Sequence, residues 1–238
     1  MRVRAARLKR ARRRMVRRHI AGRGISDARV LDAMASVPRE HFVRPGLSHR
    51  AYADGPLPIG EGQTISQPYV VAWMAEAAEL GTEDRVLEVG TGSGYAAAVL
   101  GLIAAEVYTI ERHAVLAEGA RERLHRLGYG NVHVRYGDGT AGWNEHAPYD
   151  AIVVAAAGPD VPEALCDQLV AEGRLVMPLG RPWRGQSLVR LRRGPKGSFT
   201  REELGAVRFV PLVGQDELPL RNAPMRPPPA SRPRPESR

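Results

Sequence analysis

The sequence has little of several features that define common protein classes. It holds one cysteine, Cys166, among 238 residues, so an internal disulfide is excluded and we expect Cys166 to pack in the interior. No run approaches the ~18 unbroken apolar residues of a membrane-spanning helix, and the N-terminus lacks the apolar core of a secretory signal. The seven histidines show no metal-ligand spacing. We therefore expect a cytoplasmic protein that holds no metal and contacts no membrane.

Acidic residues are absent from the first 18 positions, which hold ten lysines or arginines. The two ends, residues 1–18 and 221–238, carry +10 and +4 of a net charge of +9, which leaves −5 for residues 19–220. A surface that follows a phosphate backbone needs Lys and Arg on the folded body itself. We therefore expect no nucleic-acid partner for the body, while a weak contact of the basic ends with nucleic acid stays open.

The composition predicts one folded domain, 15–220, between two disordered ends. Residues 1–14 are mostly arginine and alanine and form a basic extension. The sequence leaves open whether translation starts at Met1 or at Met15. Residues 221–238 hold six prolines and five arginines, too few apolar groups to pack. Within the domain we separate a helical, substrate-side segment, 15–80, from a Rossmann-like core, 81–220, and we expect a monomer.

Apolar runs alternate with helical segments in the second part of the chain. We expect strands at 85–89, 107–110, 132–136, 151–155 and 174–179. This alternation is typical of an α/β fold with a doubly wound, mostly parallel sheet. Two further strands, 187–191 and 206–212, are joined by a Gly-rich turn too short for a crossover helix. They should form an antiparallel edge.

Two helices are expected upstream of the sheet. Ser26 can cap a helix that Pro38 would stop. Pro68 suits the first turn of a second helix, whose apolar stripe ends near Gly81. This second helix places Ser66 beside a helix N-terminus.

The strongest local signal is a glycine loop after the first strand, Glu88-Val-Gly90-Thr-Gly92-Ser-Gly94. Glycines there let the backbone take unusual dihedrals and let a ligand approach closely. A dinucleotide fingerprint would carry its third glycine at position 95, where this chain has Tyr95. The spacing therefore favours S-adenosylmethionine (SAM) over NAD.

An acidic residue follows each of the next two strands. Glu111 lies 21 residues after Gly90, close to the ~20 expected for a carboxylate that accepts ribose hydroxyls. Asp138, in Gly137-Asp138-Gly139, can reach an adenine amino group, although such a tripeptide is also a common turn. Three acids in series at the carboxyl edge of the sheet predict a nucleoside pocket.

The segment Gly62-Gln63-Thr64-Ile65-Ser66-Gln67-Pro68 is too rich in glycine and small polar groups to form core. Its hydroxyls and the free N–H groups of the following helix start suit an anion. A plain N-cap by Ser66 explains the pattern equally well. The local pattern leaves both interpretations open.

Together these residues resemble the protein-L-isoaspartate O-methyltransferases from about Met15 to Gly214. The block Gln63-Thr-Ile-Ser-Gln-Pro68 discriminates this family from other methyltransferases that share the glycine loop. Further matching segments are Gly24-Ile-Ser-Asp27, Val37-Pro-Arg39, Phe42-Val43, Ala51-Tyr52, Pro56-Leu-Pro-Ile-Gly60, Leu87 to Tyr95, Val107 to Arg112, Pro148 to Ile152 and Phe209-Val-Pro-Leu212.

The resemblance implies a methyl transfer from SAM, leaving S-adenosylhomocysteine (SAH), to the free α-carboxylate of L-isoaspartyl residues in damaged proteins. The resulting ester starts repair through a succinimide. Ser66 is then the catalytic residue. The cofactor residues are Gln63, Thr64, Ile65, Glu88, Gly90, Gly92, Gly94, Glu111, Asp138 and Gly139. Some members offer a threonine where this chain has Val213, which leaves that contact in doubt. The family also allows an interchange of the last two strands, whose order the sequence leaves open.

Two other functions stay open at this point. A relative of the same fold methylates an aspartate side chain in one dedicated peptide product, and the absence of an added substrate domain argues only modestly against it. A nucleic-acid-binding protein that uses its arginine-rich ends is an alternative from another class.

Overall fold

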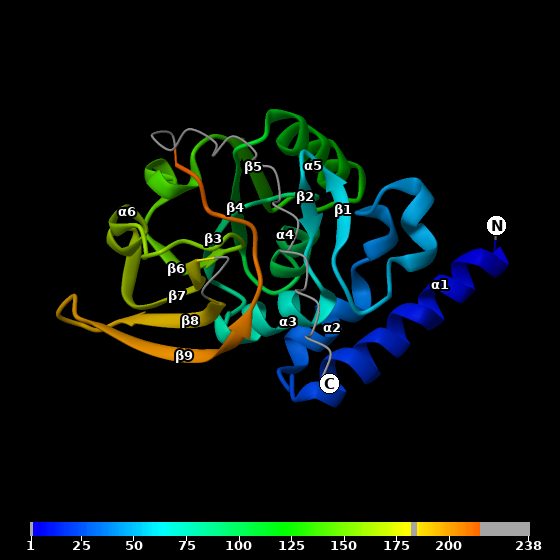
Figure 1. Cartoon of the computed structure of the whole chain (residues 1–238), viewed down its shortest axis with the longest axis horizontal. Coiled ribbons are helices and arrows are strands. Elements are labelled where there is room, and N and C mark those ends of the chain that lie inside the picture. The colour runs from blue at the N-terminus through cyan, green and yellow to red at the C-terminus, as the bar shows by residue number, and fades with distance from the viewer. Residues whose placement is uncertain (1, 182–184, 215–238) are drawn as a thin grey trace, which may run out of the picture.

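The computed structural model describes residues 2–181 and 185–214, so the tail predicted to be disordered, 221–238, lies outside the described residues. A seven-stranded sheet in the order β5-β4-β3-β6-β7-β8-β9 forms the centre of the molecule (Figure 1). Its strands are β3 Arg85–Val89, β4 Glu106–Glu111, β5 Val132–Tyr136, β6 Tyr149–Val154, β7 Leu169–Arg181, β8 Gly185–Arg193 and β9 Phe199–Val207. The predicted α/β class with a mostly parallel sheet is confirmed.

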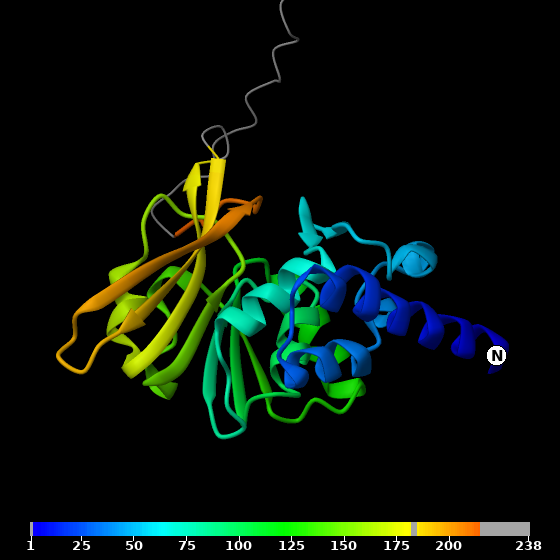
Figure 2. The ribbon, with the colours of Figure 1, turned by 90° about the horizontal axis from the view of Figure 1, so that it is seen from below.

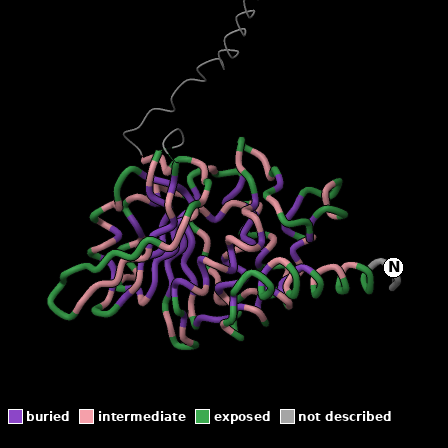
Figure 3. Tube along the Cα trace, turned by 60° about the horizontal axis from the view of Figure 1, so that its bottom comes forward, coloured by how far each residue is buried: buried purple, intermediate pink, exposed green. Residues whose placement is uncertain are grey.

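The inner strands β3, β4 and β6 are buried on both faces, which explains why they are mostly continuous apolar runs rather than alternating ones. Val86, Val107 and Ala151 lie on one face and belong to the larger core cluster. Their chain neighbours Leu87 and Ile152 lie on the other face, in the second cluster. Figure 3 shows the buried residues concentrated in the sheet and the exposed ones in the outer turns.

The helices cover the two faces unequally. Their bounds are α1 Arg2–Met15, α2 Ala28–Ser36, α3 Pro68–Ala77, α4 Tyr95–Leu100, α5 Ala114–Arg126 and α6 Glu163–Asp167. Helices α1 to α5 contribute to the larger core cluster, and Figure 2 shows α1, α2 and α3 gathered on one side of the sheet. The opposite face is covered by α6, through Leu165, and by the turns around Trp143.

Strands β8 and β9 confirm the predicted antiparallel edge. Their order in the sheet, which the sequence left open, is β7-β8-β9. Strand β8 lies between β7 and β9 and pairs antiparallel with both. The prediction of a last strand at 206–212 was wrong, because β9 ends at Val207. Its outward charges pair with β8, as Arg190 Nε does with Glu202 Oε2 at 3.1 Å. The apolar run 209–212 instead crosses the carboxyl end of the sheet, where the Leu212 amide donates to the Ala157 carbonyl at 2.8 Å.

The N-terminal extension is helical from Arg2 on, which corrects the prediction of disorder for the described part of residues 1–14. Arginine and alanine are good helix formers, and tertiary contacts fix this helix on the body. Met15 is 1% exposed, and Leu8 and Ala11 pack against the same cluster. Arg12 Nη1 also donates to the Ser36 carbonyl at 2.9 Å. Few side chains of α1 are apolar, so the sequence pattern did not indicate a packed helix.

The predicted helix starts are confirmed with one correction. Asp27, not Ser26, caps α2: its carboxylate accepts from the amides of Arg29 and Val30. The Ser26 amide donates instead to Glu76 Oε1 at 2.7 Å, which joins α2 to α3. Helix α3 begins at Pro68 as expected.

Two other expectations concern burial and the membrane. Cys166 lies on α6 and is partly buried, and burial raises the pKa of its thiol. Among the described helices, none is long and apolar enough to cross a membrane.

Candidate active site

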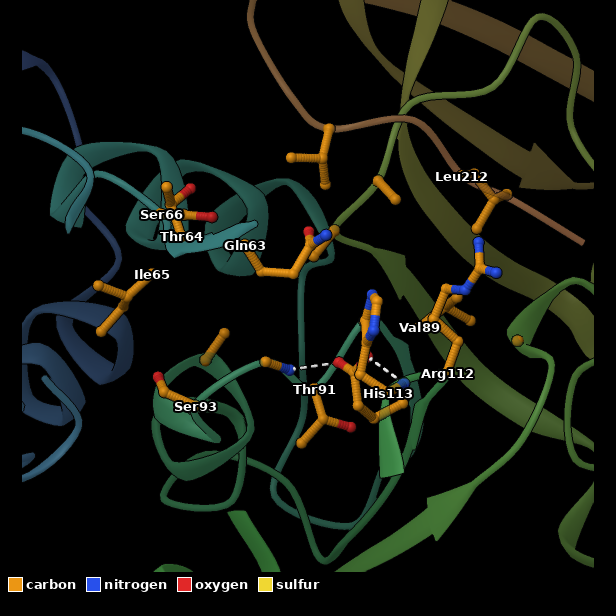
Figure 4. Close-up of a pocket in the computed structure, with 18 of the residues that line it drawn as sticks. Gln63, Thr64, Ile65, Ser66, Val89, Thr91, Ser93, Arg112, His113 and Leu212 are labelled. Carbon is orange, nitrogen blue, oxygen red and sulfur yellow. Dashed lines mark hydrogen bonds between the residues drawn. The ribbon is translucent and has the colours of Figure 1, made fainter. Parts of the chain in front are cut away.

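A cavity of about 310 Å³ opens at the carboxyl ends of β3 and β4, where open α/β sheets bind ligands. Two of its walls carry the predicted site residues, and the segment 210–213 also lines it. The sheet side consists of Gly90–Ser93, Glu111–His113 and Gly139, and the loop side consists of Gln63–Ser66. Figure 4 shows Gln63, Thr64 and Ser66 apart from Arg112 and Leu212, across the cavity.

The glycine loop on the sheet side needs glycine for two different reasons. Gly90 takes a φ of +98°, and a Cβ there would lie 3.4 Å from the Cβ of Ala155. Gly94 lies off the cavity, at the start of α4 with a φ of +84°. A Cβ on Gly94 would lie 3.1 Å from Leu124 Cδ1, so this glycine lets α4 pack closely on α5. Gly90 and Gly92 line the cavity, whereas Gly94 supports the loop from behind.

Glu111 joins the end of β4 to the glycine loop. Its Oε2 accepts from the Gly92 amide at 2.8 Å and its Oε1 accepts from the His113 amide at 2.9 Å (Figure 4). The residue is 4% exposed and lines the cavity. A carboxylate held by two backbone donors stays in one orientation toward the cavity.

Glu88 lies behind the loop and does not line the cavity. Its side chain is fully buried, and Thr109 Oγ1 donates to its Oε2 at 2.5 Å. The Thr109 hydroxyl also contacts Thr91 Oγ1 at 2.6 Å, so Glu88 supports Thr91 of the glycine loop through one intermediate. Its Oε1 is buried and finds no hydrogen-bond partner within residues 2–181 and 185–214. Burial raises the pKa of Glu88 to about 8, so the carboxyl is mostly neutral at pH 7.

Asp138 and Gly139 follow β5 at the same edge. Asp138 Oδ1 accepts from the amide and the hydroxyl of Thr140, both at 2.8 Å, and so caps the short turn that follows. Gly139 lines the cavity, whereas Asp138 lies beside it. A Cβ on Gly139 would lie 2.3 Å from Val89 Cγ1, so only glycine fits beside β3.

The loop side is carried by a separate two-stranded sheet, β1 Leu57–Gly60 and β2 Gln63–Ile65. This hairpin brings Gln63, Thr64 and Ile65 to the cavity, and Ser66 follows directly after it. Ser66 and Thr64 also border a second, larger cleft of about 840 Å³. The cavity and the cleft therefore meet at Thr64 and Ser66, and they also share Ala155 and Val210 in their linings.

The adjoining cleft has an aromatic and basic lining. Tyr69 and Trp73 of α3 lie with ring centroids 5.7 Å apart, and the Arg23 guanidinium lies 3.6 Å from the Tyr69 ring centroid. Arg208 and Phe209 complete the opposite wall. The cleft is larger than the cavity, and its cations suit carboxylates.

Several lining residues were missed at the level of sequence. They include Thr91, Ser93, Arg112, His113 and the segment 210–212. The first three directly adjoin predicted residues and His113 lies two positions from Glu111, so position alone could have indicated them. The segment 210–212 was predicted to be strand instead. Val213, whose contact was in doubt, also lines the cavity and offers only an apolar side chain there.

Comparisons with known proteins agree with this geometry. Residues 10–217 match the family described as Protein-L-isoaspartate(D-aspartate) O-methyltransferase (PCMT). The chain is 60% identical over 195 residues to Protein-L-isoaspartate O-methyltransferase 2 of Pelobacter propionicus, covering 82% of this chain and 87% of that protein. It is 60% identical over 192 residues to Protein-L-isoaspartate O-methyltransferase 1 of Geotalea uraniireducens, covering 81% and 88%.

Solved structures give the same result. A protein-L-isoaspartate O-methyltransferase structure matches with a TM-score of 0.76 and 30% identity, covering 85% of this chain and 66% of that one. A Plasmodium falciparum structure of the same description, in complex with SAH, matches with a TM-score of 0.73 and 25% identity, covering 85% and 98%. The chain belongs to the protein-L-isoaspartate(D-aspartate) O-methyltransferase family.

Proposed function

We propose that this chain is a SAM-dependent protein-L-isoaspartate O-methyltransferase. It transfers a methyl group to the free α-carboxylate of L-isoaspartyl residues in damaged proteins and peptides. The observation that carries this proposal is the junction at Thr64 and Ser66, where a nucleoside-sized cavity opens into a larger cleft. Family membership supports the same activity.

The sheet side suits SAM. Glu111 offers a fixed carboxylate for ribose hydroxyls, and Gly90 and Gly92 let a ligand lie close to the backbone. Asp138 lies beside Gly139 for the adenine, and Gln63, Thr64 and Ile65 close the cavity from the loop side. When bound, SAM supplies a methyl group that is electrophilic because it is attached to a sulfonium.

The loop side suits an acceptor that needs no activation. An isoaspartyl α-carboxylate is already ionised at neutral pH, so the site needs no general base. The protein's task is to align a carboxylate oxygen with the methyl carbon and to exclude water. Ser66 is the catalytic residue in this proposal, and its hydroxyl donates a hydrogen bond that orients the carboxylate.

The later repair steps belong to the peptide. The neighbouring amide nitrogen attacks the methyl ester, methanol leaves and a succinimide forms. Hydrolysis of the succinimide then yields partly normal aspartate. The protein therefore needs no further catalytic group after the methyl transfer.

Transfer of labelled methyl from SAM to isoaspartyl peptides tests the proposal. A panel of unrelated isoaspartyl sequences should be methylated, and matched aspartyl peptides should not. Methylation of one sequence alone would indicate a dedicated peptide-tailoring enzyme, and methylation of none would refute the acceptor.

The proposal includes the setting of the enzyme. We expect damaged proteins of the cytoplasm as its partners and a monomer as its active form. Light scattering of the pure protein tests the monomer directly.

A further inference from the structure

Arg39 is a fully buried cation for which the described part of the chain offers no acidic partner. It follows α2 in a short turn, Arg39–His41, and its side chain is 0% exposed. It forms an ion pair with no carboxylate among the described residues. Burial lowers the pKa of its guanidinium, yet an arginine stays protonated in proteins. A buried charge is costly unless its surroundings compensate it, so this position needs an explanation.

The groups that compensate Arg39 come from both walls of the active site. Its Nη2 donates to the Ser66 carbonyl at 2.8 Å, on the loop side. Its guanidinium lies 4.6 Å from the centroid of the Tyr95 ring, which follows the glycine loop and lines the cavity. Its Nε donates to the Ala51 carbonyl at 2.8 Å, which anchors the arginine in the core.

Two apolar side chains, Leu57 and Ile65, anchor the loop side in the larger core cluster. The β1–β2 hairpin is a separate two-stranded sheet that forms no ladder with the central sheet. Two-stranded hairpins have marginal stability by themselves. The Ser66 hydroxyl can be aimed only as well as its backbone is fixed, and Arg39 contacts that backbone directly.

We propose that Arg39 is a positioning residue for methyl transfer, which fixes the Ser66 backbone at a set distance from Tyr95 and the glycine loop. This inference rests on the function proposed above. It goes further by assigning the alignment of acceptor and donor to one buried side chain that touches neither. A misplacement of about 1 Å can cost on the order of 100-fold in rate, so loss of this link should act on turnover.

Arg39→Met and Arg39→Lys test the proposal, with Arg174→Met as the matched control. Arg174 also lies largely buried and donates to two backbone carbonyls, of Ala78 and Glu79, but at a distance from the cavity. Turnover is measured per folded molecule, counted by SAH titration. Arg39→Met should lose about 10-fold or more in kcat with an SAH affinity close to that of the wild type. Arg39→Lys, which keeps the charge but loses the planar fork, should fall between.

Amide hydrogen exchange provides a readout that does not depend on activity. Exchange in residues 57–67 should accelerate in both Arg39 variants and stay unchanged in Arg174→Met. Wild-type kcat in a folded Arg39 variant, or an equal loss of kcat in Arg174→Met, would overturn the proposal. If Arg39→Met does not fold, Arg39→Lys decides by the same criteria. A wild type inactive on isoaspartyl peptides would refute the proposed function, while the exchange data would still decide whether Arg39 holds the loop.

Discussion

The two sides of the active site each rest on a buried ionisable residue, and the two residues solve the same problem differently. Glu88 lies behind the sheet side and is neutralised by keeping its proton, since burial raises its pKa to about 8. Arg39 lies behind the loop side and cannot lose its charge. It is compensated in part by two carbonyls and the face of the Tyr95 ring, while its Nη1 has no hydrogen-bond partner among the described residues.

The difference follows from what holds each side in place. On the sheet side, β3 pairs with a strand on each flank, and these ladders fix the start of the glycine loop. The hydrogen bond from Thr109 to a neutral Glu88 is therefore enough to support the loop from behind. The loop side has no such ladder, and a charged, forked donor makes stronger bonds to its backbone. Variants on the sheet side should therefore act on SAM affinity and stability, and variants on the loop side on turnover.

The largest effect is expected from Glu88→Gln, in the pH dependence of stability. Between pH 4.5 and about 8 the unfolded chain releases the Glu88 proton while the folded chain keeps it, so stability falls as pH rises through this range. At about 1.4 kcal/mol per pKa unit, the total is about 3 to 5 kcal/mol. Glutamine cannot titrate, so the variant should lose this slope. Urea unfolding at pH 5, 6, 7 and 8 measures it.

Glu163→Gln is the control for this measurement, because Glu163 is exposed at the start of α6. It should keep the wild-type slope. Parallel stability profiles for the wild type and Glu88→Gln would show that Glu88 is ionised in the folded protein, and the contrast with Arg39 would then fail.

A second large effect is expected from Glu111→Ala, in cofactor affinity. The change removes two charge-assisted hydrogen bonds that hold the glycine loop and also the proposed ribose acceptor. SAH affinity should fall about 100-fold, since bonds to charged groups contribute about 1.5 to 3 kcal/mol. Titration calorimetry measures it. Glu106→Ala, at the partly exposed start of the same strand and outside the cavity lining, should bind SAH like the wild type. Unchanged affinity in Glu111→Ala would remove Glu111 from the cofactor site.

The sequence predicts the sheet side better than the loop side for a physical reason. The strands at 85–89 and 132–136 were predicted to the residue. The first is a buried, mostly apolar run, and the second is an edge strand in which Val132, Val134 and Tyr136 alternate with His133 and Arg135. Acids and glycines placed after such strands must meet at the carboxyl edge. Gly90, Gly92, Glu111 and Gly139 indeed line one cavity.

The features that could not be predicted from the sequence depend on contacts between distant segments. Nothing local distinguishes Arg39 from the exposed arginines, and its burial follows from Ala51, Ser66 and Tyr95, which come from three other segments. Strand β9 was predicted at the wrong residues because it is largely exposed and charged. Its side chains form ion pairs with β8, as Glu202 does with Arg190, and so give no apolar run. Helix α1 was not predicted because it has few apolar side chains, and these are buried only through their packing on the rest of the domain.

The shape of the sheet side can be tested by Gly139→Ala. A Cβ there would lie 2.3 Å from Val89 Cγ1, so β3 or the turn must shift and the cavity wall must move. Such overpacking costs about 1 to 3 kcal/mol, and SAH affinity should fall about 10-fold. Gly137→Ala is a close control, because a Cβ there has its nearest neighbour at 3.7 Å, an ordinary contact. Equal SAH affinities and melting temperatures for the two variants would contradict a tight fit at Gly139.

The smallest change in affinity, and the sharpest test of the contrast, is expected from Ser66→Ala. Removing one hydrogen bond to the acceptor should lower kcat for an isoaspartyl peptide about 10-fold, because a bond to a charged group is lost at the reacting carboxylate. SAH affinity should stay unchanged, since the Ser66 carbonyl remains bonded to Arg39. Ser187→Ala, on β8 and outside the cavity lining, should leave both quantities unchanged. If Ser66→Ala lowers SAH affinity as much as Glu111→Ala does, the sheet side does not govern cofactor affinity alone, and the contrast between the two sides fails. Full activity would remove Ser66 from the mechanism.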